Sequence, residues 1–305
     1  MGDSAVFSDM VSILGEGSVA RDVPMKEYTS IRTGGKARFF VEPDTTEKVL
    51  EILGYLREKN IDFYVMGNGT NLIFPDSGYD GVVIRIGGKL SRICHEGNRI
   101  TAQAGASLTA VSARALEAGL EGFEFASGIP GTIGGAVAMN AGAYDGEMSH
   151  VVAETLCVDE KGEIIRLKGE EHAFGYRKSR IQTDGLVVLD VTLQLRPGDR
   201  AEIKRRMDDF NGKRQEKQPL NMPSAGSVFK RPEGNFAGKL IQECGLKGYT
   251  IGGAQVSDKH CGFIVNLGNA TSKDVLDLIR YVRKTVYEKT GIMLEPEVRI
   301  IGGEL

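Results

Sequence analysis

Residues 126–144 read Ala-Ser-Gly-Ile-Pro-Gly-Thr-Ile-Gly-Gly-Ala-Val-Ala-Met-Asn-Ala-Gly-Ala-Tyr, a stretch with glycine at positions 128, 131, 134, 135 and 142. Glycine allows tight turns and lets a ligand approach the main chain without a Cβ in the way. The exposed N–H groups of such turns form concave sites that bind anions, phosphates above all. A buried loop in which glycine only permits packing is the alternative interpretation, and a second glycine turn upstream favours the binding site.

This second turn is Gly-Asn-Gly-Thr-Asn-Leu at residues 67–72, and it directly follows an apolar run at residues 63–66 that predicts a buried strand. A strand followed by a glycine turn is where many nucleotide sites begin. Leu72 stands where the dinucleotide-binding fingerprint needs its third glycine, and no Gly-Lys-Ser/Thr follows, so the pattern excludes that fingerprint and a P-loop. Pro75 and Gly78 then interrupt the chain, so we expect a phosphate-binding turn without a helix after it.

Three further motifs accompany the two turns: Tyr-Arg-Lys-Ser-Arg at residues 176–180, Ala-Gly-Ser-Val-Phe-Lys at 225–230 and Leu-Glu-Pro-Glu-Val-Arg at 294–299. In this order, from about residue 28 to 301, the five motifs resemble the UDP-N-acetylenolpyruvoylglucosamine reductase family. The resemblance implies an α+β fold with an FAD-binding domain of the vanillyl-alcohol-oxidase type. That domain is expected at residues 1–198, with lobes at about 28–87 and 88–198. A smaller α/β substrate-binding domain at 199–292 and a C-terminal strand at 293–305 that returns to the flavin site complete the expectation.

The resemblance also implies a reaction, the reduction of UDP-N-acetylglucosamine enolpyruvate to UDP-N-acetylmuramate for peptidoglycan synthesis. It implies non-covalent FAD and NADPH as co-substrate, with the hydride coming from FAD N5. Negative charge then develops at the α-carbon of the enol ether and spreads into the adjacent carboxylate. Such chemistry needs a cation on the carboxylate, a second hydrogen-bonding group and an acid beside the α-carbon.

The resemblance assigns these three roles to Arg177, Glu297 and Ser227 in that order. A guanidinium binds a carboxylate through two parallel hydrogen bonds and stays charged, which suits Arg177. The residues alone leave alternatives open. Arg177 could be a surface residue, Glu297 could form an ordinary ion pair with Arg299, and Ser227 could be an inert loop residue. The family places its proton donor at the position of Ser227.

The same resemblance predicts the binding residues. Contacts to FAD are expected from both glycine turns, namely from Gly67, Asn68, Gly69, Thr70, Asn71, Leu72, Ser127, Gly128, Ile129, Pro130, Gly131, Gly134, Gly135, Asn140, Gly142 and Ala143. Contacts to the substrate are expected from Lys217, Lys230 and Arg231 on the diphosphate, and from Tyr249 and His260. The last two would replace a tyrosine loop that one branch of the family inserts after the position of Arg180, because this chain resembles the shorter branch without it.

Composition bounds the remaining possibilities. The chain has 305 residues, of which 41% are hydrophobic, and a net charge of −3, which does not suggest a nucleic-acid surface. It shows no secretion signal and no apolar run long enough to span a bilayer. Four scattered cysteines predict reduced, buried thiols, and neither they nor the four histidines have metal-ligand spacing. We therefore expect a cytoplasmic monomer that binds no metal, membrane or nucleic acid.

Two other functions fit parts of the pattern. A flavin oxidase of the same superfamily often tethers FAD to a histidine near the first glycine turn, but residues 67–72 contain none. A nucleotide-binding module without redox chemistry would carry no flavin, so the colour of the purified protein separates it from the reductase.

Periodicity predicts the secondary structure. An N-cap is expected at Asp44, caps of one helix at Ser107 and Gly119, and an irregular loop at residues 218–231. Helices are expected at about residues 6–14, 47–56, 108–116, 203–210, 240–244 and 272–289. Strands are expected at 37–41, 63–66, 82–86, 93–96, 99–104, 151–159, 163–167, 186–195, 262–266 and 298–301.

Overall fold

The computed structural model describes residues 2–303, which form two compact units. Unit 1 comprises residues 2–21, Phe39–Asn68 and Gly81–Lys213, and unit 2 comprises Asp22–Arg38, Gly69–Asp80 and residues 214–303. The functional boundaries expected at residues 198 and 292 divide the chain differently and remain predictions.

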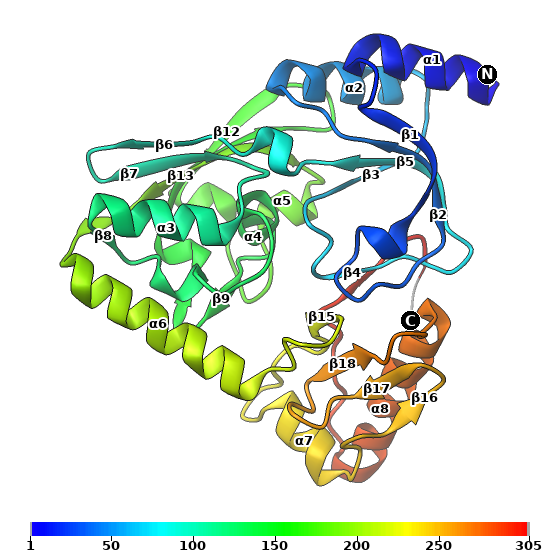
Figure 1. The fold of residues 1–305 in the computed structure, drawn as a ribbon, viewed down its shortest axis with the longest axis vertical. Helices are drawn as coiled ribbons and strands as arrows, with labels where there is room; N and C mark the ends of the chain where they lie inside the picture. Colours follow the sequence, from blue (N-terminus) through cyan, green and yellow to red (C-terminus); the bar gives the residue numbers. More distant parts are fainter. Residues whose placement is uncertain (1, 304–305) are drawn as a thin grey trace. The chain divides into compact units, whose positions relative to one another are not determined.

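Figure 1 shows the helices and strands of the described residues. The helices are α1 (Asp3–Leu14), α2 (Thr46–Glu58), α3 (Leu108–Ala118), α4 (Ile133–Ala138), α5 (Arg180–Thr183), α6 (Arg200–Lys217), α7 (Ala237–Glu243) and α8 (Ser272–Thr290). The strands are β1 (Val19–Pro24), β2 (Lys36–Val41), β3 (Phe63–Met66), β4 (Leu72–Ile73), β5 (Tyr79–Arg85), β6 (Ile93–Glu96), β7 (Arg99–Gln103), β8 (Leu120–Glu121), β9 (Gly142–Ala143), β10 (Gly146–Glu147), β11 (Val152–Val158), β12 (Ile164–Lys168), β13 (Val187–Gln194), β14 (Arg196–Pro197), β15 (Ser224–Ser227), β16 (Thr250–Ile251), β17 (Ala254–Val256), β18 (Phe263–Asn266) and β19 (Arg299–Ile300).

Unit 1 is built on a five-stranded antiparallel sheet with the strand order β12-β11-β13-β7-β6. The helix α3 follows β7, and the predicted caps are confirmed: the Ser107 side chain accepts the N–H of Ala110, and Gly119 ends the helix in the left-handed conformation. The helix α4 packs against β13 and β7, which brings the long glycine stretch onto this sheet.

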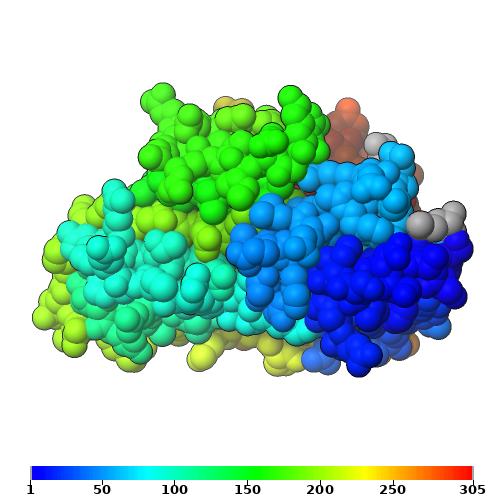
Figure 2. All heavy atoms as spheres, turned by 90° about the horizontal axis from the view of Figure 1, so that it is seen from above, coloured from blue at the N-terminus to red at the C-terminus, as the bar shows by residue number. Residues whose placement is uncertain are grey.

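A second sheet, with the order β1-β2-β5-β3, contains the parallel pair β3 and β5. The helices α1 and α2 lie side by side on the surface of unit 1 (Figure 2). Val49, Ile52, Leu53 and Leu56 form the buried face of α2, at the spacing expected of an amphipathic helix. The predicted cap of α2 at Asp44 is wrong by one residue, because the Thr45 side chain accepts the Lys48 N–H while Asp44 forms an ion pair with Lys48.

Unit 2 contains an antiparallel sheet with the order β15-β18-β17-β16 and the helices α7 and α8. A capping box of Thr271 and Asp274 starts α8, whose apolar face is buried. The prediction of an irregular loop at residues 218–231 is wrong in part, since residues 224–227 form the edge strand β15. A further pair, β4 with β19, is parallel.

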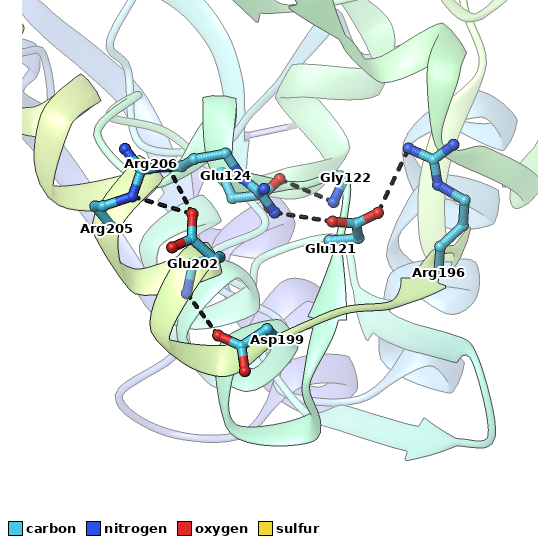
Figure 3. Close-up of polar contacts among 8 residues, drawn as sticks. All are labelled: Glu121, Gly122, Glu124, Arg196, Asp199, Glu202, Arg205 and Arg206. Atoms are coloured by element: carbon cyan, nitrogen blue, oxygen red, sulfur yellow. Dashed lines mark hydrogen bonds and ion pairs between the residues drawn. The ribbon is translucent and has the colours of Figure 1, made fainter.

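A network of charges joins α6 to the rest of unit 1 (Figure 3). Glu124 is a buried carboxylate whose side chain is 9% exposed. It accepts hydrogen bonds from Arg206 Nε at 3.1 Å, from Arg206 Nη2 at 2.6 Å and from the Gly122 N–H at 2.8 Å. Arg206 also bonds Glu121, at 2.9 Å. Since a buried carboxylate is stable only when it is paired and hydrogen-bonded, Arg206 fixes α6 in place.

We expect Arg206→Ala to lower the free energy of unfolding by about 3 kcal/mol, because it leaves Glu124 buried without its cation. Arg205→Ala is the matched control: the neighbouring arginine forms a solvent-exposed ion pair with Glu202, and such pairs contribute little. Chemical denaturation of both variants measures the difference. Equal losses in the two variants would contradict a special contribution from the buried pair.

Candidate active site

The two glycine turns meet in unit 1 through a close contact between Gly67 and Thr132. A Cβ on Gly67 would overlap the Thr132 hydroxyl, and a Cβ on Gly134 would lie 2.9 Å from the Cβ of Ala104. Real Cβ atoms do not approach other atoms this closely, so both positions require glycine. The contact sets the loop of residues 128–132 against the end of β3.

The backbone donors around this contact divide into two groups. The first N–H groups of α4 bind protein acceptors: Ile133 donates to Ala106 O, Gly134 to Ala104 O and Gly135 to Thr132 Oγ1. In contrast, among residues 2–303 no hydrogen bond is found that is donated by the backbone N–H of Gly67, Asn68, Gly128 or Gly131, although the neighbouring Ser127 and Ile129 donate to Glu124 O and Ala126 O. Backbone N–H groups need acceptors, and a phosphate supplies several at once. These donors therefore fit the pyrophosphate of a dinucleotide such as FAD.

Arg177 lies in a tight turn of unit 1 beside the glycine stretch. Gly175 and Lys178 exchange both backbone hydrogen bonds across the turn, at 2.9 and 3.1 Å. Arg177 has a φ of 55°, a left-handed conformation that glycine normally adopts. The half-buried guanidinium donates to Asn140 O at 3.5 Å and to Gly142 O at 3.2 Å. Two carbonyl groups of the glycine stretch thus fix the arginine that the sequence predicts to bind the substrate carboxylate.

Glu147 is a further member of this site that the sequence does not single out. Its carboxylate accepts hydrogen bonds from Ser149 Oγ and from Asn140 Nδ2. Burial alone would raise the pKa of Glu147, but these hydrogen bonds and the charges of His150 and Arg177 lower its pKa overall. A charged Glu147 therefore lies within the electrostatic reach of Arg177. No motif signals this residue, because its role depends on the hairpin of β9 and β10 that brings it back to Asn140.

Ser227 and Glu297 are brought together within unit 2. The register of β15 against β18 shifts between Ser224 and Ser227, and Gly226 has a φ of 77° within this bulge. Bulges redirect side chains and are common beside active sites. The chain after Ser227 pairs with the segment that carries Glu297, since the Glu297 N–H donates to Val228 O at 2.7 Å. The Ser227 hydroxyl donates to Phe229 O at 3.3 Å.

Asn71 connects the first glycine turn to Glu297. Its Nδ2 donates to the Glu297 carbonyl at 3.0 Å, and its own carbonyl accepts the Arg299 N–H at 3.0 Å. Both bonds belong to unit 2, where they align β4 with β19. The sequence predicts Asn71 as an FAD contact, and the structure shows that its side-chain amide also holds the backbone of the predicted catalytic glutamate.

The five predicted substrate residues all lie in unit 2, in different surroundings. Lys230 forms an ion pair with Glu295, and the Arg231 guanidinium lies 4.0 Å from the centroid of the Phe236 ring. Lys217 is exposed at the end of α6. His260 accepts the Gly262 N–H on Nδ1 at 3.1 Å, and burial lowers its pKa.

His260 lies near Ser227, whereas Tyr249 does not. A Cβ on Gly262 would contact both the His260 ring, at 2.9 Å, and Ser227 Oγ, at 3.6 Å. Tyr249 instead stacks on Tyr281 with ring centroids 4.4 Å apart, next to β16 at the edge of the sheet opposite β15. The structure therefore groups His260, but not Tyr249, with the predicted proton donor.

The described part of the chain contains neither a metal-binding cluster nor a membrane-spanning helix. Within it no group of three or more His, Cys, Asp or Glu side chains is arranged to hold a metal ion. None of its helices combines the length and the apolar character needed to cross a membrane. The four cysteines are unpaired, and Cys94 is exposed, contrary to the expectation that all four are buried.

Comparison with known proteins identifies the two parts of this chain. Residues 37–168 match the profile of an FAD binding domain, and residues 218–301 match that of the UDP-N-acetylenolpyruvoylglucosamine reductase C-terminal domain. The glycine turns at 67–72 and 126–144 lie in the first match, whereas Ser227 and Glu297 lie in the second.

Similar full-length proteins carry the same description. A UDP-N-acetylenolpyruvoylglucosamine reductase from Clostridium perfringens is 51% identical over 300 residues, which cover 97% of this chain and 98% of the relative. One from Geobacillus kaustophilus is 52% identical over 299 residues, 98% of each chain. The crystal structure of UDP-N-acetylenolpyruvylglucosamine reductase from Thermus caldophilus superposes with a TM-score of 0.79 at 36% identity, over 92% of this chain and 97% of that one.

These matches confirm the α+β fold class and FAD as the cofactor. Because half of its residues are identical to those relatives over nearly their whole length, the chain belongs to the UDP-N-acetylenolpyruvoylglucosamine reductase family.

Proposed function

We propose that this protein reduces UDP-N-acetylglucosamine enolpyruvate to UDP-N-acetylmuramate with NADPH as the reductant. Its family membership supports the proposal, and one observation within the structure carries it. The guanidinium of Arg177 is held on the carbonyl groups of the same glycine stretch whose N–H groups fit a pyrophosphate. A cation for the substrate carboxylate is thus attached to the stretch of chain that would also bind the cofactor.

The glycine turns hold FAD without a covalent bond. Their N–H groups suit the pyrophosphate, and residues 67–72 contain no histidine that would tether the flavin. When bound and reduced by NADPH, FAD would supply the hydride that reduces the double bond of the enol ether.

The residues of the chain control charge and the proton. Arg177 binds the substrate carboxylate and stabilises the charge that develops on it, and Glu297 provides the second hydrogen-bonding group. Ser227 Oγ transfers its proton to the α-carbon, and this requires the hydroxyl to leave its present acceptor, Phe229 O. Serine is a weak acid, so the transfer works only toward a strongly basic carbon.

Further proposals concern the substrate and the setting. Lys230 must exchange Glu295 for the substrate diphosphate, to which Lys217 and Arg231 supply further donors, while His260 covers the substrate in place of the missing tyrosine loop. Tyr249 is left out of the proposed substrate site because of its place at the opposite sheet edge.

We also propose that the protein acts as a cytoplasmic monomer, without binding nucleic acid or membrane. Its product would then serve cell-wall synthesis during growth and division.

We expect Gly67→Ala to abolish most FAD binding, because the added methyl group forces the first turn away from Thr132. Gly54→Ala is the control, since a Cβ there meets no atom within 4 Å in α2. The FAD content of each variant is measured as the flavin released on acid precipitation. For the unmodified protein, all of the yellow colour should then pass into the supernatant. Colour that stays in the pellet would disprove non-covalent binding, and normal FAD content in Gly67→Ala would disprove the role of the turn.

We expect Arg177→Ala and Glu297→Ala each to lower kcat by roughly 10²–10³-fold with FAD content unchanged, as for the loss of one preorganised donor. Arg166→Ala, which removes an exposed arginine paired with Glu154, serves as the control. The assay is NADPH consumption that depends on the enolpyruvyl substrate, with UDP-N-acetylmuramate identified as the product.

Three results would count against these assignments. A variant with normal kcat and a raised KM would show that its residue only binds substrate. An unmodified protein without substrate-dependent turnover, or with a different product, would overturn the proposed function itself.

Ser227→Ala should separate the two halves of the reaction. Reduction of the flavin by NADPH needs no proton at carbon, so bleaching should proceed at nearly the normal rate. Reoxidation by the enolpyruvyl substrate should slow by roughly 10²–10⁴-fold, the usual range for a positioned acid. Ser227→Cys should recover part of this rate, because a thiol is the stronger acid. Anaerobic stopped-flow absorbance measures both halves, and equal slowing of the two would make Ser227 a structural residue.

A further inference from the structure

Asn140 lies at the end of the glycine stretch, where the sequence predicts a contact with FAD. Its side chain is instead enclosed by protein, and the residue is 1% exposed. It follows Met139, the C-cap of α4, and has a φ of 41°, a left-handed conformation that asparagine tolerates better than most residues.

The amide of Asn140 has all its hydrogen-bonding groups engaged. Nδ2 donates to the Gly175 carbonyl and to Glu147 Oε1, both at 3.0 Å. Oδ1 accepts the Ser149 N–H at 2.9 Å. Two of the partners are acceptors and one is a donor, and only a primary amide supplies two donors and an acceptor on one short side chain. The partners therefore demand asparagine here, in this orientation of the amide.

These bonds act on the turn that carries Arg177. Gly175 begins the turn, and Arg177 follows two residues later in its left-handed conformation. A non-glycine residue keeps such a conformation only when its surroundings hold it there. Asn140 contacts the turn twice: its amide binds the Gly175 carbonyl, and its own carbonyl accepts Arg177 Nη1. Asn140 thus contacts both the backbone and the guanidinium of the arginine segment, and Gly142 O is a second acceptor for the guanidinium.

We propose that Asn140 is a positioning residue that sets the backbone turn and the guanidinium of Arg177 for the substrate carboxylate. This rests on the proposed role of Arg177. Asn140 also donates a hydrogen bond to Glu147, a carboxylate within electrostatic reach of Arg177, and so keeps that carboxylate from competing with the substrate for the guanidinium.

The test is a double-mutant cycle of Asn140→Asp with Arg177→Ala, followed by anaerobic stopped-flow absorbance. Asn140→Asp keeps the shape of the side chain and replaces the donor toward Gly175 O and Glu147 by an acceptor. Alone, it should slow flavin reoxidation by substrate about 10–100-fold, a part of the loss expected for Arg177→Ala itself. In the Arg177→Ala background it should slow reoxidation no further than about twofold, since no guanidinium remains to be positioned. NADPH-dependent bleaching and FAD content should not change.

Thr101→Val is the matched control for loss of a side-chain hydrogen bond in unit 1, because Thr101 bonds Thr192 across the paired strands β7 and β13 and neither residue belongs to the Arg177 turn. It should leave both halves of the reaction unchanged. Asn140→Ser, which keeps a small polar side chain but loses the reach to Gly175, repeats the cycle should Asn140→Asp fail to fold. If both variants unfold, Asn140 is only structural and the proposal is wrong.

The remaining outcomes separate the two proposals. Full additivity of Asn140→Asp and Arg177→Ala would overturn the positioning role while leaving Arg177 intact as a catalytic residue. Loss of FAD from Asn140→Asp, or equal slowing of bleaching and reoxidation, would assign Asn140 to the cofactor site instead. Normal reoxidation in Arg177→Ala alone would overturn the role of Arg177 and the inference that depends on it.

Discussion

The contact between Gly67 and Thr132 is the constraint on which the site in unit 1 depends. A side chain on Gly67 would displace Thr132, and Thr132 caps α4 through Gly135. The end of β3, the loop before α4 and the start of α4 are therefore fixed by one close approach of backbone to side chain. The first N–H groups of α4 donate to protein acceptors. The donors that remain for a ligand therefore lie in the loops on either side of the contact between Gly67 and Thr132. We therefore expect phosphate binding here to rely on turn geometry more than on the dipole of a helix.

Left-handed residues other than glycine gather around the same stretch. Asn140, Tyr144, Asp145 and Arg177 all have positive φ angles. Hydrogen bonds hold Asn140 and Arg177, and the Tyr144 ring stacks on Phe210 of α6 with the ring centroids 4.5 Å apart. A non-glycine residue keeps this unfavourable backbone conformation only where contacts with its surroundings hold it in place. Such residues are typical of binding and catalytic sites. In each unit, the side chain of one asparagine from a glycine turn hydrogen-bonds the backbone of a predicted catalytic segment. Asn140 donates to Gly175 O in the turn of Arg177, and Asn71 donates to Glu297 O.

The sequence predicts local structure well where periodicity and capping are strong. The helices α1, α3 and α8 and the hairpin of β6 and β7 lie where their patterns place them. The family and the FAD cofactor also follow from the order of the five motifs, and the comparisons confirm both. The individual contacts of the predicted site residues with FAD and substrate remain predictions.

Long-range contacts explain what the sequence misses. The strand β15 is short and contains a bulge at Gly226, so only its pairing with β18 defines it. Glu147 has no motif of its own and reaches the site through the hairpin of β9 and β10. The glycine-rich run around Asn140 predicts a contact with FAD but gives no sign of the three tertiary hydrogen bonds that its side chain makes. Tyr249 is aromatic and lies in the C-terminal region, but the strand order separates it from Ser227.

A crystal structure of the protein with FAD bound would test whether the glycine turns form the cofactor site. We expect the pyrophosphate oxygens to accept the N–H groups of Gly67, Asn68, Gly128 and Gly131, with the Arg177 guanidinium still on the carbonyls of Asn140 and Gly142. A pyrophosphate bound at the N-terminus of α4 through Gly134 and Gly135, or away from both turns, would contradict this description.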